Sequence, residues 1–393
     1  MIQKKISNKV LPAGEALSGI SFLKRNWKLI NGVKSFNATC EIAYLDAVKN
    51  LSQKSDTEKE IAELQKIDEQ YLYKDAGISD NHKNKKSDIK KLQNKISKTK
   101  DGKIKIGKYY AVLMFDADTM GKWLSGEKLK PDADLKDFQD KLSGKLVEFA
   151  ESAEKYVNGD KGNEVPTKKG QVIYAGGDDF LALIGLEYLF DVVIKLREEF
   201  KRIINSDEIN ELKENIDNEI TFSAGIAIAH YKTPLSYVLG EARKAEHTAK
   251  DEGDRNAFAI TVLKRSGEIV KAYHKWNFED VDSVKLLQSL IKYRLEDKLS
   301  RTFINNFYAE FKPLLENIQV KLTSKPIEME FKRLMKSSKS DKFDKSEFEN
   351  FRNEILKLMK TKTEIGRKIN IQNFVNLLYI SDFISREINK PLN

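Results

Sequence analysis

The alternation of apolar and polar positions is clearest between residues 105 and 265. Leu189, Val193, Leu196 and Phe200 recur at the spacing of one helix face, whereas every second residue from Ile220 to Ile228 is apolar or small, as in a strand. Read in this way, the region predicts strands at 109–115, 172–174, 180–184, 219–229 and 256–263, and helices at 135–157, 187–204 and 234–251.

This order of elements, β-α-β-β-α-β followed by one α-β unit, predicts an α+β fold. It is the order of a ferredoxin-like domain, in which an antiparallel-centred sheet carries helices on one face. In that topology the first strand lies beside the strands of the hairpin. Residues 105–268 are therefore expected to form one mixed domain.

Both flanks of this domain have helical patterns. Residues 51–104 are highly charged, yet Ile61, Leu64 and Ile67 fall at helical spacing, which predicts charged helices joined by a loose turn at 75–86. After about residue 270 the apolar residues again follow helical intervals, and residues 332–345 are rich in Lys, Ser and Asp, as in a mobile loop. We therefore predict an N-terminal helical region at 1–104 and an all-helical C-terminal domain at 269–393.

Two acidic clusters end apolar runs in the central domain. Asp116 and Asp118 follow the run that begins at Tyr110, and Gly176-Gly177-Asp178-Asp179 separates the two strands of the hairpin. The glycine pair is expected to supply the positive φ angles of a tight turn. If the strands are neighbours, three or four carboxylates converge at one sheet edge. Such a group of oxygen ligands suits two Mg²⁺ ions and phosphoryl transfer.

The composition of the chain indicates which partners and which cellular compartment suit such a site. The 393 residues include 69 Lys and Arg against 60 Asp and Glu, a net charge of +9, which is consistent with an anionic partner or with solubility alone. Cys40 is the only cysteine, which excludes an intramolecular disulfide and a cysteine-based zinc cluster. No secretory signal or membrane-spanning run is evident, so we expect a cytoplasmic protein without membrane contact.

Four ordered motifs resemble the large subunit of type III CRISPR effector complexes, most closely the Cmr type. They are the segment from Phe115 to Leu124, the hairpin from Gly176 to Asp179, the strand from Ser223 to His230, and Gly253-Asp254-Arg255-Asn256-Ala257-Phe258. The central domain is similar to the second palm domain of that family, which is distantly related to nucleotide cyclases. The resemblance extends to 14–25 and 36–43, which look like stretches that precede the second palm in a region with a degenerate zinc-insert-like segment, and to a C-terminal helix at 377–387.

The resemblance implies a nucleotidyltransferase that joins ATP into cyclic oligoadenylate when a guide RNA complex captures its target. Two Mg²⁺ or Mn²⁺ ions would activate the 3′-hydroxyl and neutralise the departing pyrophosphate. It assigns catalysis and metal binding to Asp116, Asp178 and Asp179, with Asp118 as a further metal ligand. It assigns nucleotide binding to Gly121, Gly176, Gly177, Lys250 and Arg255.

Differences between this sequence and the family indicate which partners and metals the chain would need. The family's large subunit usually begins with an HD nuclease domain and a first palm, so we expect this chain to be the C-terminal part of a split or truncated large subunit, with the first palm on a separate polypeptide. Ser18 and Ser21 stand where the family often has cysteines, so no zinc is expected. The partners implied are the first-palm polypeptide, other Cmr-type subunits, and guide and target RNA within the complex.

Two other functions compete with this one. The chain can be a structural module whose helical tail docks on neighbouring subunits, with a palm that is inactive without its twin. A diguanylate cyclase is disfavoured, because the turn ends in Asp179 where a glutamate is expected. The product also stays open, since some such families are thought to join ATP to another metabolite such as S-adenosylmethionine.

Overall fold

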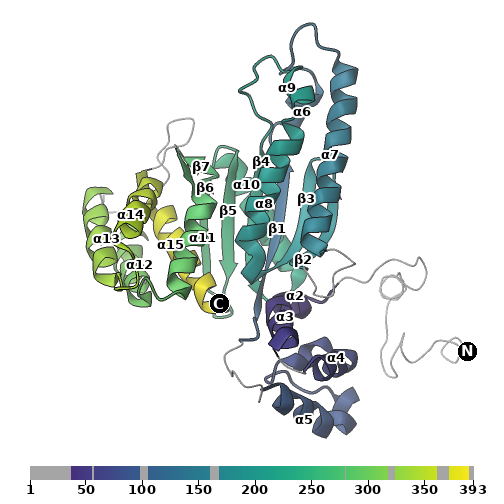
Figure 1. The fold of residues 1–393 in the computed structure, drawn as a ribbon, viewed down its shortest axis with the longest axis vertical. Coiled ribbons are helices and arrows are strands. Elements are labelled where there is room, and N and C mark those ends of the chain that lie inside the picture. The colour runs from purple at the N-terminus through teal and green to yellow at the C-terminus, as the bar shows by residue number, and fades with distance from the viewer. Residues whose placement is uncertain are drawn as a thin grey trace, which may run out of the picture. The chain divides into compact units, whose positions relative to one another are not determined.

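A six-stranded mixed sheet organises the chain (Figure 1). In this computed structural model, the described residues are 37–54, 57–97, 105–159, 168–278, 280–316, 324–360 and 371–388. The strand order is β2-β3-β1-β4-β5-β6. The bounds are β1 Tyr109–Ala117, β2 Gly170–Gly176, β3 Asp179–Gly185, β4 Phe222–His230, β5 Ala257–Leu263 and β6 Ile269–Lys275.

The first four strands with α7 (Leu135–Asn158) and α8 (Leu189–Ile204) form the predicted ferredoxin-like unit. The strand β1 pairs antiparallel with both β3 and β4, and β5 then adds parallel to β4. The α+β prediction is therefore confirmed, with strand and helix bounds close to those expected. Short elements follow β1 and α8, namely α6 (Met120–Leu124) and α9 (Asp207–Asn210).

The expectation that helices cover one face is wrong. Side chains at odd positions of β1, such as Leu113, share a core with α7 and α8, whereas Val112 packs in a second cluster with Val238 and Ala242 of α10 (Leu235–Asp251). Every residue of β4 is buried. The small side chains that alternate along β4 leave room for a helix on the second face instead of facing solvent.

The described residues before the sheet are mainly helical, as predicted. They comprise α2 Thr39–Ala43, α3 Leu45–Lys54, α4 Glu58–Ile67 and α5 Lys86–Ser97, with short 3₁₀ turns η2 Glu69–Leu72 and η3 Asp80–Lys85 between the last two helices. These helices belong to the same cluster as Val112 and α10. The zinc-insert-like positions Ser18 and Ser21 lie outside the described residues.

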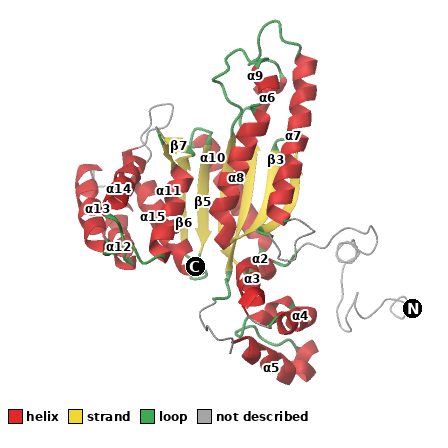
Figure 2. Ribbon diagram, in the orientation of Figure 1, coloured by secondary structure: helices red, strands yellow, loops and turns green. Residues whose placement is uncertain are grey.

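The C-terminal region begins with strands that the sequence analysis missed. The strand β6 pairs antiparallel with β5, and the small strands β7 Asn277–Phe278 and β8 Val281–Asp282 follow, so the helices start only at Ser283. They gather beside the β6 edge (Figure 2). Their bounds are α11 Ser283–Leu295, α12 Arg301–Glu316, α13 Ser324–Ser338, α14 Lys345–Lys360 and α15 Ile371–Glu387. The first part of the loop predicted at 332–345 is thus helical.

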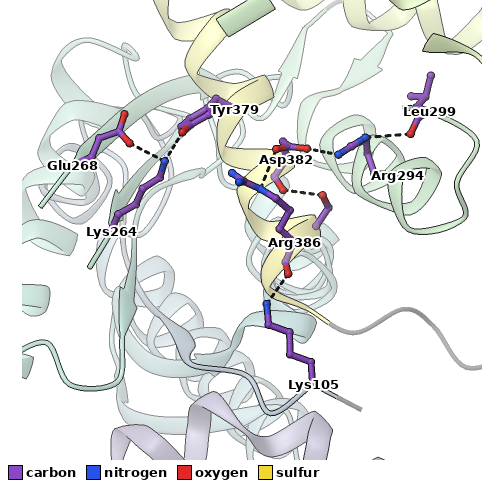
Figure 3. A network of polar contacts seen from close by, with 9 residues as sticks. Lys105, Lys264, Glu268, Arg294, Leu299, Tyr379, Asp382 and Arg386 are labelled. Carbon is purple, nitrogen blue, oxygen red and sulfur yellow. Dashed lines mark hydrogen bonds and ion pairs between the residues drawn. The ribbon is translucent and has the colours of Figure 1, made fainter. Parts of the chain in front are cut away.

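A polar network ties α15 to its surroundings (Figure 3). Asp382 of α15 pairs with Arg294 of α11, and both side chains are fully buried. On the other side, the hydroxyl of Tyr379 accepts a hydrogen bond from Lys264, which follows β5. The described residues from Ala38 onward form one compact unit. None of the described helices is long and apolar enough to cross a bilayer.

Candidate active site

The hairpin turn lies beside the end of β1, as the sequence predicted. Asp116 is the register partner of Asp179, and the N–H of Ala117 donates to the carbonyl of Asp178 over 3.2 Å. Asp116 is four residues from Val112 along β1, and Asp179 is four residues from Leu183 along β3, so each aspartate points to the same face as its strand neighbour. Val112 and Leu183 pack in the cluster that contains α10. Both carboxylates therefore lie on the α10 face of the sheet.

The turn itself uses one glycine rather than two for its positive φ. Gly177 has φ +62°, while Gly176 ends β2 as the register partner of Asp179. A positive φ at the first of two central positions is the pattern of a type II′ hairpin. A Cβ at Gly177 or Gly121 would have no atom within 4 Å, and one at Gly176 would meet only the side chain of Tyr174. The space in front of Gly121 and Gly177 is therefore open.

Asp179 lies close enough to Asp116 for its titration to be perturbed. Burial, a hydrogen bond to Asp116, and the negative charges of Asp116, Asp178 and Glu246 raise the pKa of Asp179 to about 6. Within the described residues no group of three or more His, Cys, Asp or Glu is arranged to hold a metal ion. The expected convergence of three or four carboxylates is thus reduced to one pair, with Asp178 near enough to act through its charge.

Lys250 reaches this pair from the last turn of α10. Its ammonium pairs with Asp116, and with Glu246 over 2.6 Å. Burial opposes the charged form, but hydrogen bonds to Asp116 and Glu246 raise the pKa of Lys250 above its ordinary value. The lysine is therefore a cation held against the carboxylates.

The close approach of α10 depends on Gly225 in β4. A Cβ there would lie 2.2 Å from the carbonyl oxygen of Ala242 and 2.3 Å from the nitrogen of Glu246. No side chain fits in that gap. Glu246 and the spacing role of Gly225 were missed from the sequence, because only the packing of α10 on β4 brings them to the site.

Asp118 belongs to a different network. It is 4% exposed, and its carboxylate accepts hydrogen bonds from the hydroxyls of Thr221 and Ser223, both at 2.7 Å, and from the N–H of Asn256 at 2.9 Å. The structure thus places Asp118 in a network apart from the Asp116–Asp179 pair, with its oxygens joining β4 to the loop before β5, and its role as a metal ligand stays a prediction.

A set of cations surrounds the end of β1. Lys128 is half-buried, donates to the hydroxyl of Thr119 over 3.3 Å and lies 4.8 Å from the ring of Trp123. Burial, with the charges of Lys122 and Arg255, lowers its pKa. The ammonium of Lys122 forms an ion pair with Glu127. The side chain of Arg255 is exposed to solvent. Lys128 was not predicted, since nothing in its local sequence distinguishes it from other lysines.

The donor set of the carboxylate pair fits a divalent cation. Mg²⁺ is usually held by one or two carboxylates, with water and substrate phosphates completing its shell. Asp116 and Asp179 supply only hard oxygen donors, and their mutual repulsion is the kind that a bound cation relieves. With open space beside two glycines and cations nearby, the arrangement is suited to a metal-bound phosphate ester.

Comparison with known families supports this geometry. Residues 109–259 match the model described as "Cas10/Cmr2, second palm domain". The chain carries a second palm domain of the Cas10/Cmr2 family. The palm domain contains the carboxylate pair, Gly121, the hairpin, Lys250 and Arg255, so the resemblance inferred from the four motifs is confirmed.

Individual proteins and solved structures are also similar to this chain. The Cmr subunit Cmr2 of Pyrococcus furiosus is 31% identical over 225 residues, which cover 51% of this chain and 24% of that protein. A chain of the type III-B Cmr-beta complex bound to cognate target RNA aligns with a TM-score of 0.49 and 14% identity, over 93% of this chain and 49% of its own. A chain of the Csm1–Csm4 cassette in complex with cA4 aligns with a TM-score of 0.38 and 18% identity, over 70% of this chain and 36% of its own.

Proposed function

We propose that this chain is the nucleotidyltransferase subunit of a type III CRISPR effector complex, converting ATP to cyclic oligoadenylate or a related adenylylated messenger. The observation that carries the proposal is the register pairing of Asp116 with Asp179 on the α10 face of a Cas10/Cmr2 palm domain. The chain spans about a quarter of the length of its Cmr2 relative. The proposed partners are a polypeptide with the first palm, the other Cmr-type subunits, and guide and target RNA, all in the cytoplasm.

Each residue of the site has a role in this proposal. Asp116 and Asp179 would hold Mg²⁺ or Mn²⁺, with Asp178 adding negative charge. The bound ions would supply two effects, a lower pKa for the attacking 3′-hydroxyl and neutralisation of the departing pyrophosphate. Lys250 would exchange its contact with Asp116 for a phosphate oxygen once a cation occupies the pair. Arg255 would bind phosphate, and Gly121, Gly176 and Gly177 would leave room for the nucleotide.

The test is product formation by the assembled complex. The protein is combined with its partner subunits, guide RNA, target RNA, Mg²⁺ or Mn²⁺ and ATP, and products are identified by mass spectrometry. We expect Asp116→Asn and Asp178→Ala/Asp179→Ala to lose the product while the complex still assembles. Asp217→Asn is a matched control, since Asp217 is an exposed aspartate in a turn outside this site. Unchanged ATP consumption by the double variant would refute the assignment.

The scaffold alternative predicts a different result. If the helices after Ser283 serve only to dock neighbouring subunits, the aspartate variants behave like wild type and neither forms a product. Collapse of the complex on substituting Asp178 and Asp179 would also favour that alternative. Because one palm supplies one nucleotide pocket, we expect little turnover from this chain in isolation, and the product mass distinguishes a cyclic oligoadenylate from a conjugate.

A further inference from the structure

The loop between α10 and β5 has an unusual backbone. Asp254, Arg255 and Asn256 have φ values of 58°, 55° and 42°. Non-glycine residues rarely adopt this left-handed conformation, and three in succession are costly unless the surroundings hold them. The loop directly follows the helix turn that carries Lys250, and the N–H of Arg255 donates to the carbonyl of Lys250 over 3.2 Å.

Two buried charged side chains hold this loop from opposite sides. From the end of β1, the carboxylate of Asp118 accepts a hydrogen bond from the N–H of Asn256 over 2.9 Å. From β6, the ammonium of Lys275 donates to the carbonyls of Asp254 and Arg255 over 2.7 and 2.8 Å. Asp118 is 4% exposed and Lys275 is 5% exposed. Both groups contact the backbone of the loop, so they fix its conformation whatever its side chains do.

The loop conformation determines where the guanidinium of Arg255 lies. Arg255 is exposed, and its side chain makes no hydrogen bond or ion pair with any other residue that the structure describes. Burial and the charges of Lys122 and Arg255 lower the pKa of Lys128, whereas Glu127 and Asp118 act in the opposite direction, and Lys128 forms no ion pair with a carboxylate among the described residues. Cations that lie near one another repel each other, and a bound polyanion would relieve that repulsion.

We propose that Asp118 and Lys275 are positioning residues that hold the 254–256 loop so that Arg255 faces the triphosphate of bound ATP. This inference rests on the proposed function, because ATP is the ligand assumed at the site. It replaces the role of metal ligand for Asp118 with a structural one. Neither residue touches substrate, and both act through Arg255.

The test is a double-mutant cycle read as affinity for ATP in the presence of Mg²⁺, measured on the full chain alone and in its complex. We expect Lys275→Met and Arg255→Gln each to weaken ATP binding about tenfold, the size of one charge-assisted hydrogen bond. The double variant should be no weaker than Arg255→Gln alone, since Lys275 acts through that arginine. Lys271→Met is the matched control on the same strand, because Lys271 pairs with Glu241 and not with the loop, and it should bind as wild type does.

A second variant guards against simple misfolding of Lys275→Met. Asp118→Asn approaches the loop from the other side and should give a loss of similar size that also vanishes in the Arg255→Gln background. Its affinity for Mn²⁺ without nucleotide should equal that of wild type, whereas Asp116→Asn should lose it. Loss of Mn²⁺ affinity in Asp118→Asn, or losses that multiply in the double variants, would overturn the inference.

The inference and the proposed function fail separately. ATP binding with the expected coupling but without product would refute the proposed activity and leave the positioning roles intact. Normal product formation with unchanged ATP affinity in Arg255→Gln would do the reverse. A wild-type chain that binds no ATP, either alone or in the complex, would overturn both.

Discussion

Gly225 shapes the candidate site although it does not face it. Its missing side chain lets α10 lie against β4, and this brings Glu246 and Lys250 to the carboxylate of Asp116. The acidic pair was visible in the sequence because both members end apolar runs. Glu246, by contrast, lies far from either aspartate in the chain, and no local pattern indicates which of the charged residues of α10 faces the sheet.

Gly225→Ala is expected to destabilise the protein by about 1–3 kcal/mol, the usual cost of overpacking. The new methyl group would meet the backbone of α10, which cannot move aside as a flexible side chain can. Chemical denaturation followed by circular dichroism measures the change. Gly240→Ala is the control: it lies within α10, its Cβ would have no atom within 4 Å, and we expect it to stabilise by about 0.5–1 kcal/mol. Equal stability of the two variants would contradict the packing argument.

Glu187 provides a pH-dependent prediction. Burial, and then the charge of Asp46, raises the pKa of Glu187 to about 8 from an ordinary 4.5. The folded state therefore binds the proton more tightly than the unfolded chain, so stability falls as the pH rises from about 4.5 through about 8. We expect Glu187→Gln to remove this part of the decline. Unfolding midpoints of both proteins at pH 5 and pH 8.5 should converge at the lower pH and favour the variant at the higher one.

At the scale of helices and strands, an element could be predicted from the sequence when its own residues carry a clear apolar pattern. The helices α7 and α8 and the strand β1 were predicted because an apolar stripe or run marks each of them. The strand β6 was missed because Lys271, His274 and Lys275 interrupt its apolar positions, although Val270 and Ala272 are buried. The face covered by α10 was also mispredicted, since small residues on β4 can mean either solvent or a close-packed helix.

The contact between α11 and α15 gives a prediction for a pair of elements. Arg294 and Asp382 are fully buried, and Arg294 also donates to the carbonyl of Leu299 over 3.1 Å. Arg294→Met leaves the buried carboxylate of Asp382 with Arg386, at 3.1 Å, as its remaining ion pair among the described residues, so we expect a cost of about 3 kcal/mol in the free energy of unfolding. Lys292→Met in the same helix breaks only an exposed pair with Glu296, and should change stability by less than about 1 kcal/mol. Similar losses in both would show that burial of the pair is unimportant.

At the scale of the whole molecule, a single hydrophobic core runs from the palm sheet into the C-terminal helices. Phe222 of β4, Trp276 after β6 and Phe374 of α15 all belong to it. The boundary predicted at residue 268 falls between two paired strands of one sheet, and the division into separate domains stays a prediction. Phe115 of β1 and Phe180 of β3 also belong to this core, so unfolding of the strands that carry the carboxylate pair is coupled to unfolding of the helices through common packing.

That coupling makes metal binding measurable as stability of the full chain. A cation that binds only the folded state raises the free energy of unfolding, by about 1.4 kcal/mol at ten times its dissociation constant. We expect Mg²⁺ or Mn²⁺ to raise the melting temperature of wild type, and chelation by EDTA to reverse the rise. Asp116→Asn and Asp179→Asn should lose the shift, whereas Asp217→Asn should keep it. A shift that persists in both site variants would place the cation elsewhere, because the pair at the ends of β1 and β3 would then contribute no ligand.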